Sequence, residues 1–269
     1  ASRPSAGRRG CSGSRVGWTG MIELKTPEEI ARMRRAGALV AQLLAMLAAR
    51  VKPGVKTKAL DEAALDFIRS AGAKPAFLGY RGFPASICVS VNEEVVHGIP
   101  GARVIREGDV VSVDAGAVLE GYCADAALTV AVGSLPKGAQ RLIDVTRRAL
   151  EEAILLATPA HRLSDISHAV QDVVEREGLS IVRDFVGHGI GRAMHEDPPI
   201  PNYGPPNRGP RLKPGMVLAI EPMVTMGSWE VEVLSDGWTA VTKDRSLAAH
   251  FEHTVAITEQ GPHVLTQLN

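Results

Sequence analysis

Two aspartates, Asp114 and Asp125, lie inside segments that are otherwise apolar and rich in β-branched residues. Residues 110–118 and 122–132 alternate enough to be read as strands, and Leu119-Glu120-Gly121 between them is a turn pattern. In a hairpin, residues equidistant from the turn face each other. A loop at Leu119-Glu120 therefore predicts that the two aspartates form a direct cross-strand pair, with Cβ atoms roughly 5 Å apart on one face.

Like charges placed opposite each other destabilise a sheet, and charges inside an apolar hairpin lose hydration as well. Something positive is therefore needed beside Asp114 and Asp125, and a divalent cation is the simplest answer. Two alternatives stay open from this stretch. An Arg or Lys partner could supply the charge, or a register slip of one residue could turn one carboxylate toward solvent.

The bulk composition describes an ordinary globular protein of one large or two small domains, with 269 residues, 45% hydrophobic and 22% charged. Its 30 basic and 30 acidic side chains give no global field that would attract nucleic acid or anionic lipid. The three cysteines, Cys11, Cys88 and Cys123, show no CxxC spacing, which fits a reducing compartment. The most apolar segment, residues 39–49, is too short to cross a bilayer, and no secretory signal is visible. We expect a cytoplasmic protein without membrane contact.

Residues 1–20 carry four arginines, no acid and many Gly and Ser residues, a composition typical of disorder. Met21 begins a sequence that looks like a native N-terminus. We therefore expect a disordered Arg/Gly/Ser-rich extension at 1–20 and a single folded domain at 21–269. An organellar targeting peptide shares the Arg and Ser bias, but the apolar face that it needs is missing.

Helix signals frame the aspartate hairpin. Thr26-Pro27-Glu28-Glu29 predicts a helix start, with Thr26 as N-cap and Glu29 as its capping-box partner. This helix should run to about Arg50, and a second one, capped by Thr57, should end near Gly72. Two further helices are expected at about 136–157 and 164–177. The other strands are expected near 87–91, 182–186, 216–224, 229–234 and 250–258.

An internal repeat relates two of the strands. Segments 108–114 and 215–221 both run from a turn glycine through an apolar strand to an acid. Each is preceded by two helices and by a His-Gly-Ile triplet, although the spacing from triplet to acid differs, 17 residues against 33. The repeat predicts an α+β protein of two related α/β halves that face each other, with Asp114 and Glu221 at equivalent places.

Three more acids or imidazoles stand where a core strand should be apolar: His188, Glu221 and Glu252. Taken singly, a strand glutamate is usually exposed or salt-bridged, and a histidine is usually a satisfied core residue. With Asp114 and Asp125 they form a set of four carboxylates and one imidazole, without a matching run of buried Lys or Arg. Two divalent ions, roughly 3.5 Å apart, would cancel the four charges and generate a nucleophile at neutral pH.

The composition of this set bears on the metal. An oxygen-rich set with one imidazole favours Mn, Fe or Co over a structural zinc. His195-Glu196 has no second histidine at the position that a His-Glu-x-x-His zinc peptidase requires.

Residues 185–203, Phe-Val-Gly-His-Gly-Ile-Gly-Arg-Ala-Met-His-Glu-Asp-Pro-Pro-Ile-Pro-Asn-Tyr, resemble the signature of type I methionine aminopeptidases. The resemblance covers residues 21–268 and implies the pita-bread (creatinase/aminopeptidase) fold, with two pseudo-symmetric halves and an antiparallel sheet around a dinuclear metal site. The absence of a long insertion after Tyr203 is similar to type I and unlike type II. The ordered set that matches the family's active site is His97, Asp114, Asp125, His188, His195, Glu221 and Glu252.

This resemblance implies two divalent metal ions, drawn from Co, Mn, Fe, Zn and Ni. Asp114 would chelate one ion, Asp125 and Glu252 would bridge both, and His188 and Glu221 would complete the other.

The activity that the resemblance implies is removal of the initiator methionine from nascent proteins, with a preference for small second residues. A hydroxide between the ions would attack the first peptide carbonyl, with Glu221 as the proton shuttle. His195 would stabilise the oxyanion, and His97 would contact the scissile amide nitrogen.

The resemblance also implies a pocket for the methionine side chain, beside His97 and His195, formed by Tyr80, Phe83, Cys88, Met194 and Trp238. A flexible thioether suits an apolar pocket with aromatic and sulfur contacts. Ordinary core packing would explain each of the five residues equally well without the family. Two departures concern the shape of this pocket: Met194 stands where the family often has Phe, and Phe77 replaces a small residue common in bacterial members.

The expected partners are the N-termini of nascent polypeptides, and a monomer is the family expectation. The basic clusters Arg32/Arg34/Arg35 and Arg147/Arg148 are interpreted as solvated helix faces, with transient contact to the ribosome as the alternative. Two rival functions stay open. A proline-specific peptidase of the same fold would need a different pocket and a larger N-terminal domain, and an inactive binding module would require the loss of a ligand.

Overall fold

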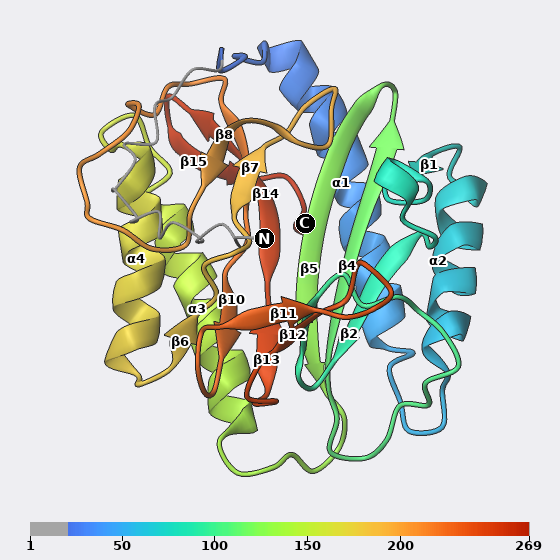
Figure 1. Ribbon diagram of the computed structural model, residues 1–269. Coiled ribbons are helices and arrows are strands. Elements are labelled where there is room, and N and C mark those ends of the chain that lie inside the picture. The colour runs from blue at the N-terminus through green and yellow to red at the C-terminus, as the bar shows by residue number, and fades with distance from the viewer. Residues whose placement is uncertain (1–20, 269) are drawn as a thin grey trace, which may run out of the picture.

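The computed structural model describes residues 21–268 of the chain. The extension expected at residues 1–20 lies outside the described residues. Within residues 21–268 two pairs of helices accompany a large central sheet (Figure 1), and no helix there is long and apolar enough to span a membrane.

Helix α1 (Pro27–Ala48) begins where the capping box predicts. The backbone N–H of Glu29 donates to Thr26 Oγ1 at 3.3 Å, and the N–H of Thr26 donates to Glu29 Oε2 at 2.9 Å. These bonds satisfy two donors that a helix start otherwise leaves without partners. Helices α3 (Ala139–Leu155) and α4 (Leu163–Arg176) also form close to their predicted ranges.

Helix α2 (Thr57–Ser70) begins with Thr57 itself, and its N-cap is Lys56, which makes no side-chain capping bond. The prediction that Thr57 caps this helix was therefore wrong. The Thr57 hydroxyl accepts from the N–H of Gly101 at 2.8 Å and donates to the Gly101 carbonyl at 3.2 Å. It ties the helix start to a distant loop and is not free to cap.

The central sheet is antiparallel and has the main path β1-β4-β5-β14-β9-β7-β8, with β2 beside β4 and β15 beside β14. Its strands are β1 (Lys74–Pro75), β2 (Ile87–Val91), β4 (Val110–Leu119), β5 (Tyr122–Ala131), β7 (Gly187–Gly189), β8 (Glu196–Ile200), β9 (Val217–Ile220), β14 (Glu252–Thr258) and β15 (Gly261–Val264). One small sheet contains β3 (Glu94–Val96), β11 (Val231–Val233) and β12 (Ala240–Thr242), and another contains β6 (Ser180–Ile181), β10 (Met223–Thr225) and β13 (Ala248–His250).

The prediction of a strand at residues 182–186 was wrong. Strand β6 ends at Ile181, and the backbone bends at residues 183 and 184. Val182 is fully buried against Met223 and its neighbours, so the apolar character of this stretch reflects packing and not strand structure.

Two longer predicted strands are each interrupted once. The strand expected near 216–224 splits into β9 and β10 at Glu221-Pro222, because proline has no N–H to donate to the ladder. The strand expected near 250–258 is interrupted at Phe251, between β13 and β14. As a result Glu221 lies just beyond a strand end, and Glu252 begins a strand.

The β4–β5 hairpin forms, but its turn is Glu120-Gly121 and not residues 119–120. Both turn residues have positive φ, 52° and 81°, as a type I′ turn requires. Asp114 consequently faces Ala127, two residues beyond Asp125. The predicted direct pair was therefore wrong. The aspartates are diagonal neighbours, and they share one face because side-chain direction repeats every two residues.

Each helix pair covers its own half of the sheet (Figure 1). Helices α1 and α2 pack beside β2, β4 and β5, whereas α3 and α4 pack together beside β9 and β14. One buried apolar cluster runs no further than Val132, and the other begins at Leu142. The hairpin β11–β12 crosses the sheet on the face opposite α1. The described chain thus folds as the two α/β halves that the repeat predicts.

A pseudo-twofold axis relates the halves. Strands β5 and β14 lie together at the centre of the sheet, and β4 and β9 flank them. If Asp114 corresponds to Glu221, the pairing registers make Ala127 correspond to Glu252. These last two residues are paired directly with each other, so the axis passes between them.

The same pseudo-twofold axis relates two threonines, Thr129 and Thr254. The N–H of Asp125 donates to Thr254 Oγ1 at 3.0 Å, and this hydroxyl donates to the Asp125 carbonyl at 2.7 Å. In the same way, the N–H of His250 donates to Thr129 Oγ1 at 3.0 Å, and that hydroxyl donates to the His250 carbonyl at 2.8 Å. The two halves are thus joined by a matched pair of buried hydroxyl bridges, one on each side of the axis.

The two His-Gly-Ile triplets, in contrast, are not equivalent. His188 lies on β7, which pairs with β9. His97 follows β3, and the carbonyl of Gly98 accepts from the N–H of Val89 in β2 at 2.9 Å. Since β2 is the strand that corresponds to β7, the first triplet lies one strand further out than the second, in keeping with the different spacing from triplet to acid.

We expect Thr254→Val to lower the free energy of unfolding by about 1–3 kcal/mol, because it removes both bonds of one bridge and leaves buried backbone groups without partners. Urea unfolding of the metal-free protein measures this change. Thr258→Val is the matched control, since the Thr258 hydroxyl bonds only within its own partly exposed turn, where it donates to the Gly261 carbonyl and accepts from the Gln260 N–H. The control should change stability by less than about 0.5 kcal/mol. Equal effects of the two substitutions would contradict a special role for the bridge.

Candidate metal centre and substrate pocket

Side chains from both halves meet near the junction of β5 and β14. One ligand atom from each of Asp125, His188 and Glu252 lies within 4.8 Å of the other two. Asp114 on β4 lines the same cavity as these three residues. His188 Nε2 is 3.5 Å from Oε1 of Glu221. The structure thus brings together all five residues that the sequence analysis named as metal ligands.

This cluster has no positive partner in the described chain: no Lys or Arg forms an ion pair with any of the four carboxylates. Burial raises the pKa of Asp114 to about 7. Burial, followed by repulsion from neighbouring acids, raises the pKa of Asp125, Glu221 and Glu252 well above the usual range.

Three oxygens of the cluster are buried without any hydrogen-bond partner: Asp114 Oδ1, Asp125 Oδ1 and Glu252 Oε1. Orphaned carboxylate oxygens beside an imidazole are the donor set that divalent cations bind. The alternatives of an Arg or Lys partner, or of a carboxylate turned to solvent, do not occur among residues 21–268. The residues present therefore fit two divalent ions.

His188 is oriented for ligation. Its Nδ1 lies 2.9 Å from the Gly189 carbonyl, and because a carbonyl only accepts, Nδ1 carries the proton and Nε2 keeps its lone pair. Burial, followed by the neighbouring His195, lowers the pKa of His188 to about 4, so the ring is neutral at pH 7. A Cβ added at Gly187 would lie 2.4 Å from the Ala219 carbonyl oxygen, so only glycine lets β7 approach β9 this closely.

The two other predicted histidines, His97 and His195, line one cavity together with the five ligands. Tyr80 stacks on His195 with ring centroids 5.3 Å apart, and its hydroxyl bonds to His195 Nδ1 at 2.9 Å. His97 adopts a positive φ of 59° and lies edge-on to Phe185, with centroids 5.3 Å apart. Desolvation lowers the pKa of both histidines. The surroundings of both imidazole rings therefore favour the neutral form.

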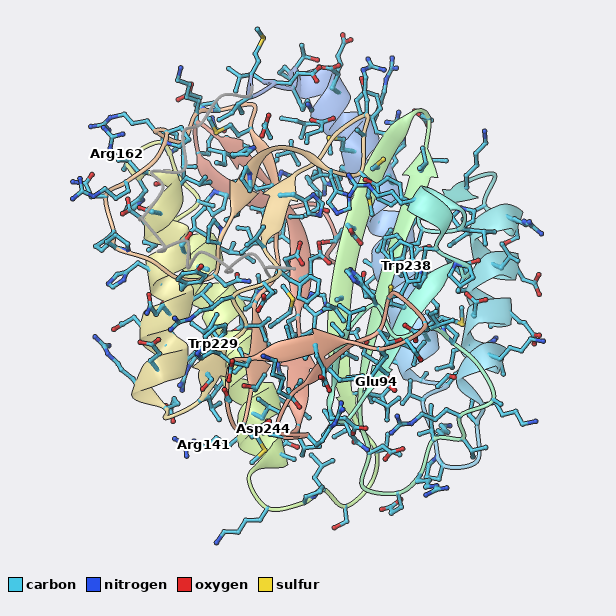
Figure 2. The ribbon with its side chains drawn as sticks, in the orientation of Figure 1. Glu94, Arg141, Arg162, Trp229, Trp238 and Asp244 are labelled. Carbon is cyan, nitrogen blue, oxygen red and sulfur yellow. The ribbon has the colours of Figure 1, made fainter. Side chains whose placement is uncertain are left out.

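The ligands share this cavity, of about 160 Å³, with apolar side chains that form a pocket at its other side. Trp238, at the tip of the β11–β12 loop (Figure 2), meets Phe83 edge-on with centroids 5.2 Å apart. A Cβ at Gly116, opposite Asp125, would lie 2.6 Å from Met194 Cε and 2.8 Å from Phe77 Cε1, so a larger residue there would displace both side chains. Met194 itself is buried behind the wall and does not line the cavity. Of the five predicted pocket residues, those that line it are Tyr80, Phe83, Cys88 and Trp238.

Two residues near the cluster, His250 and Arg81, were not predicted from the sequence. His250 is 2% exposed, and its Nε2 has no hydrogen-bond partner and lies 3.9 Å from Glu221 Oε2. The repeat could have found it, because the pseudo-twofold axis makes His250 the counterpart of Asp125. Arg81 borders the cavity beside Tyr80. No motif marks it, since it belongs to a loop without periodicity.

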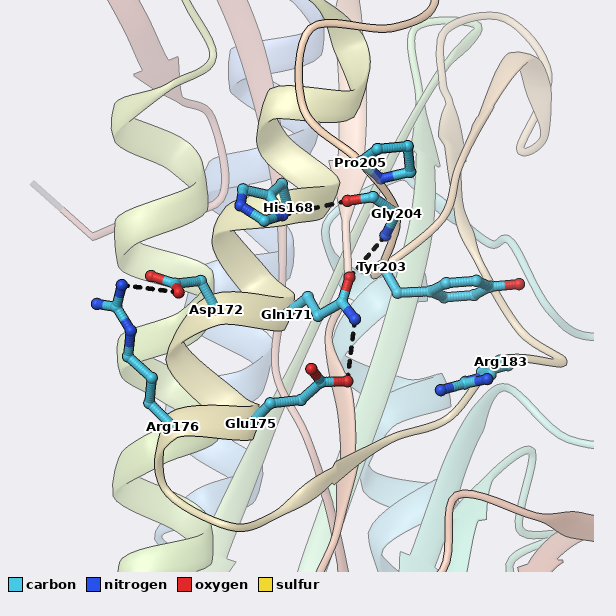
Figure 3. Close-up of a pocket in the computed structure, with 9 residues that line it drawn as sticks. All are labelled: His168, Gln171, Asp172, Glu175, Arg176, Arg183, Tyr203, Gly204 and Pro205. Carbon is cyan, nitrogen blue, oxygen red and sulfur yellow. Dashed lines mark hydrogen bonds and ion pairs between the residues drawn. The ribbon is translucent and has the colours of Figure 1, made fainter.

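A larger hollow of about 680 Å³ lies along α4, away from the ligand cluster (Figure 3). Its polar groups are paired with one another: Gln171 bonds to the N–H of Gly204 at 2.8 Å, and Arg176 pairs with Asp172 at 2.9 Å. Arg183 lies over the Tyr203 ring at 5.3 Å. This hollow holds no orphaned buried group in the described chain, and we assign it no chemistry.

Removing the metal should make stability depend on pH. The pKa of Asp114 is raised from 3.8 to about 7 by folding, so this group contributes stability that is fully present below pH 3.8. That stability is lost as the pH rises through about 7. The lowered pKa of His188 acts in the opposite sense, but only below pH 6.5. We therefore expect the Tm of chelator-treated protein to fall from pH 6.5 to about 8.5, and added Mn²⁺ to stabilise more at the higher pH. Scanning calorimetry at both pH values measures this, and a pH-independent effect of Mn²⁺ would contradict it.

Comparison with known proteins agrees with this geometry. Residues 31–259 match the model of metallopeptidase family M24. Methionine aminopeptidase 1 of Bacillus subtilis is 55% identical over 248 residues, covering 92% of this chain and 100% of the relative. A methionine aminopeptidase of Clostridium acetobutylicum is also 55% identical, over 91% of this chain and 99% of the relative.

Solved structures extend the likeness. The crystal structure of methionine aminopeptidase from Thermotoga maritima has a TM-score of 0.91 and 50% identity, covering 92% of this chain and 100% of that one. Prolidase from Pyrococcus furiosus has a TM-score of 0.75 and 24% identity, covering 91% of this chain and 66% of that one, which shows a shared fold alone. The predicted pita-bread fold and the predicted resemblance are both confirmed. The chain belongs to metallopeptidase family M24 and, within it, to the methionine aminopeptidases.

Proposed function

We propose that this protein removes the N-terminal methionine from polypeptide chains as a two-metal aminopeptidase, with a preference for small second residues. The observation that carries the proposal is that the ligand cluster and an apolar pocket share one cavity. Such a cavity can hold a methionine side chain and present the following carbonyl to the metals.

Asp114, Asp125, His188, Glu221 and Glu252 would hold two divalent cations. These cations would supply Lewis-acid chemistry, lowering the pKa of a water and polarising the scissile carbonyl. Three carboxylates and the imidazole come from different strands, so the sheet itself sets their spacing.

Glu221 is proposed to move the proton, accepting it from the attacking water and returning it to the leaving amine. It lies just beyond β9, and its carbonyl is fixed by a bond from Asn202 Nδ2 at 3.0 Å. This anchor limits how far the carboxylate can move between the two proton transfers.

His195 is proposed to stabilise the oxygen that becomes negative in the transition state. If the Tyr80 hydroxyl donates to Nδ1, the neutral ring carries its proton on Nε2 and can donate there. His97, held between Phe185 and Trp238, is proposed to contact the scissile amide nitrogen.

The methionine side chain is proposed to occupy the pocket of Tyr80, Phe83, Cys88 and Trp238, with Met194 shaping its wall from behind. Burial raises the pKa of Cys88 well above its usual range, so this thiol stays neutral. A neutral sulfur and aromatic rings make favourable contacts with a thioether.

The partners are proposed to be N-termini of nascent chains, met in the cytoplasm by a monomer whose catalytic domain spans 21–269. The free thiols of Cys88 and Cys123 fit a reducing compartment. In the basic clusters, Arg35 pairs with Glu120, Arg147 with Asp144 and Arg148 with Glu177. These pairs favour solvated helix faces over ribosome contact.

The direct test compares hydrolysis of Met-Gly-Met and Ala-Pro-Ala by protein with added Mn²⁺ or Co²⁺. We expect cleavage of the first peptide only, because the apolar side chains that line the pocket suit a methionine side chain. A chelator should abolish the activity. Cleavage of Ala-Pro-Ala would support the proline-specific alternative, and activity that a chelator leaves intact would contradict a metal mechanism.

Two substitutions separate metal binding from transition-state stabilisation. We expect Asp125→Asn to abolish turnover and to reduce metal content, because a neutral amide would bind divalent cations more weakly than a carboxylate. His195→Ala should lower kcat by about 10²–10³ while leaving the metal content intact. Elemental analysis beside steady-state kinetics measures both quantities. Loss of metal in His195→Ala would show that its proposed role is wrong.

A further inference from the structure

Arg81 lies in the short 3₁₀ turn η1 (Tyr80–Gly82), on the rim of the substrate pocket. Its backbone is left-handed, with φ 49° and ψ 22°, a conformation that non-glycine residues rarely adopt. The N–H of Gly79 donates to the Phe83 carbonyl at 2.9 Å, and the N–H of Phe83 donates to the Tyr80 carbonyl at 2.9 Å. These bonds close the turn and fix the place from which the Arg81 side chain projects.

The guanidinium of Arg81 is the only Lys or Arg group among the described residues that line the pocket. Its Cζ lies 5.5 Å from the centroid of the Tyr80 ring, which in turn stacks on His195. No carboxylate of residues 21–268 forms an ion pair with it, although twelve Lys or Arg ion pairs occur elsewhere in this part of the chain. Burial is the main cause of the lowered pKa of His195, and the positive charge of Arg81 lowers it further.

The two ends of the cavity differ in exposure. Asp125 is 5% exposed and Glu252 is 2% exposed, whereas Arg81 and His195 are exposed residues. A peptide with its first carbonyl at the ligand cluster must therefore leave the cavity over the rim that contains Arg81. Two divalent cations would cancel the charge of the four carboxylates, so the guanidinium is the uncompensated charge that the leaving chain meets.

We infer that Arg81 is a specificity-determining residue that selects substrates by the charge of their third residue, favouring acidic over basic side chains. The inference rests on the proposed aminopeptidase function. Its physical basis is a charge-assisted contact between the guanidinium and a substrate carboxylate at the solvent-exposed rim. An equally placed lysine side chain would be repelled.

A purely structural role predicts something different. If Arg81 served only to hold the Tyr80 ring, its loss would displace Tyr80 and His195 and would slow the hydrolysis of every peptide equally. A charge-reading role changes the ratio between acidic and basic substrates, mainly through KM. The ratio therefore separates the two roles.

The test uses peptides that differ only in the third residue: Met-Gly-Asp-Gly-amide, Met-Gly-Asn-Gly-amide and Met-Gly-Lys-Gly-amide. The amide removes the terminal carboxylate, which would otherwise compete for Arg81. With Mn²⁺-loaded protein at low ionic strength, we expect kcat/KM for the Asp peptide to exceed that for the Lys peptide about twofold to fivefold. The ratio should shrink in about 0.5 M salt, because exposed charges are screened.

Arg81→Gln should bring the Asp/Lys ratio to about one, and Arg81→Lys should retain most of it. Neither substitution introduces glycine, so both side chains meet the same backbone demand as arginine. Arg50→Gln is the matched control, since Arg50 is an exposed arginine beyond the end of α1 and outside the pocket. This control should keep the wild-type ratio.

A wild-type ratio near one would overturn the inference, as would an unchanged ratio in Arg81→Gln. An equal loss of activity toward all three peptides in that variant would also overturn it, in favour of the structural role. Failure of the wild-type protein to cleave the neutral Asn peptide would instead contradict the proposed function, so the two failures are distinguishable.

Discussion

Mutual repulsion among four desolvated carboxylates is the constraint on which this structure depends. Asp114, Asp125, Glu221 and Glu252 are gathered without a cation from the described chain, and three of their oxygens have no hydrogen-bond partner. In an apolar interior such a set is unfavourable unless divalent ions neutralise it. The ligand cluster is therefore neutralised only when metal is bound. In the metal-free protein, the apolar packing of the two halves must offset the unfavourable free energy of the buried carboxylates.

The pseudo-twofold axis shows how the cluster is assembled. The same arrangement of strands, with its threonine bridges, occurs on both sides of the axis. The chemistry, however, is not symmetric. Asp125 has His250 as its counterpart, and Glu252 has Ala127, so the repeated scaffold carries different side chains at related positions. A symmetric scaffold with asymmetric ligands would give two bound cations different surroundings, which suits a reaction whose attacking and leaving groups differ.

The sequence predicted the ligand cluster because a charged residue inside an apolar strand is a strong and local signal. It predicted that Asp114 and Asp125 share a face, since this depends only on the parity of their spacing. It could not predict their register, because a left-handed Glu120 that moves the turn by one residue leaves no mark in the pattern.

Other misses have the same origin. The false strand at 182–186 and the misassigned cap at Thr57 both arose where a tertiary contact, with Met223 or with Gly101, decided what a local pattern left ambiguous. His250 was missed because a single histidine at the end of an apolar strand does not differ from an ordinary core residue in the sequence. Arg81 became visible only when folding placed its loop on the rim of the cavity. Sequence patterns thus identified what the site contains, and the folded chain decided what surrounds it.

The two threonine bridges have a consequence for how the protein is put together. Residues 133–138 link the first half to α3, and the two largest apolar clusters lie on opposite sides of that link, whereas smaller clusters contain residues from both sides. A chain divided there would leave Asp114 and Asp125 on one fragment and His188, Glu221 and Glu252 on the other. Neither fragment alone could bind a dinuclear centre. Uptake of two ions would therefore require the two halves to be docked against each other.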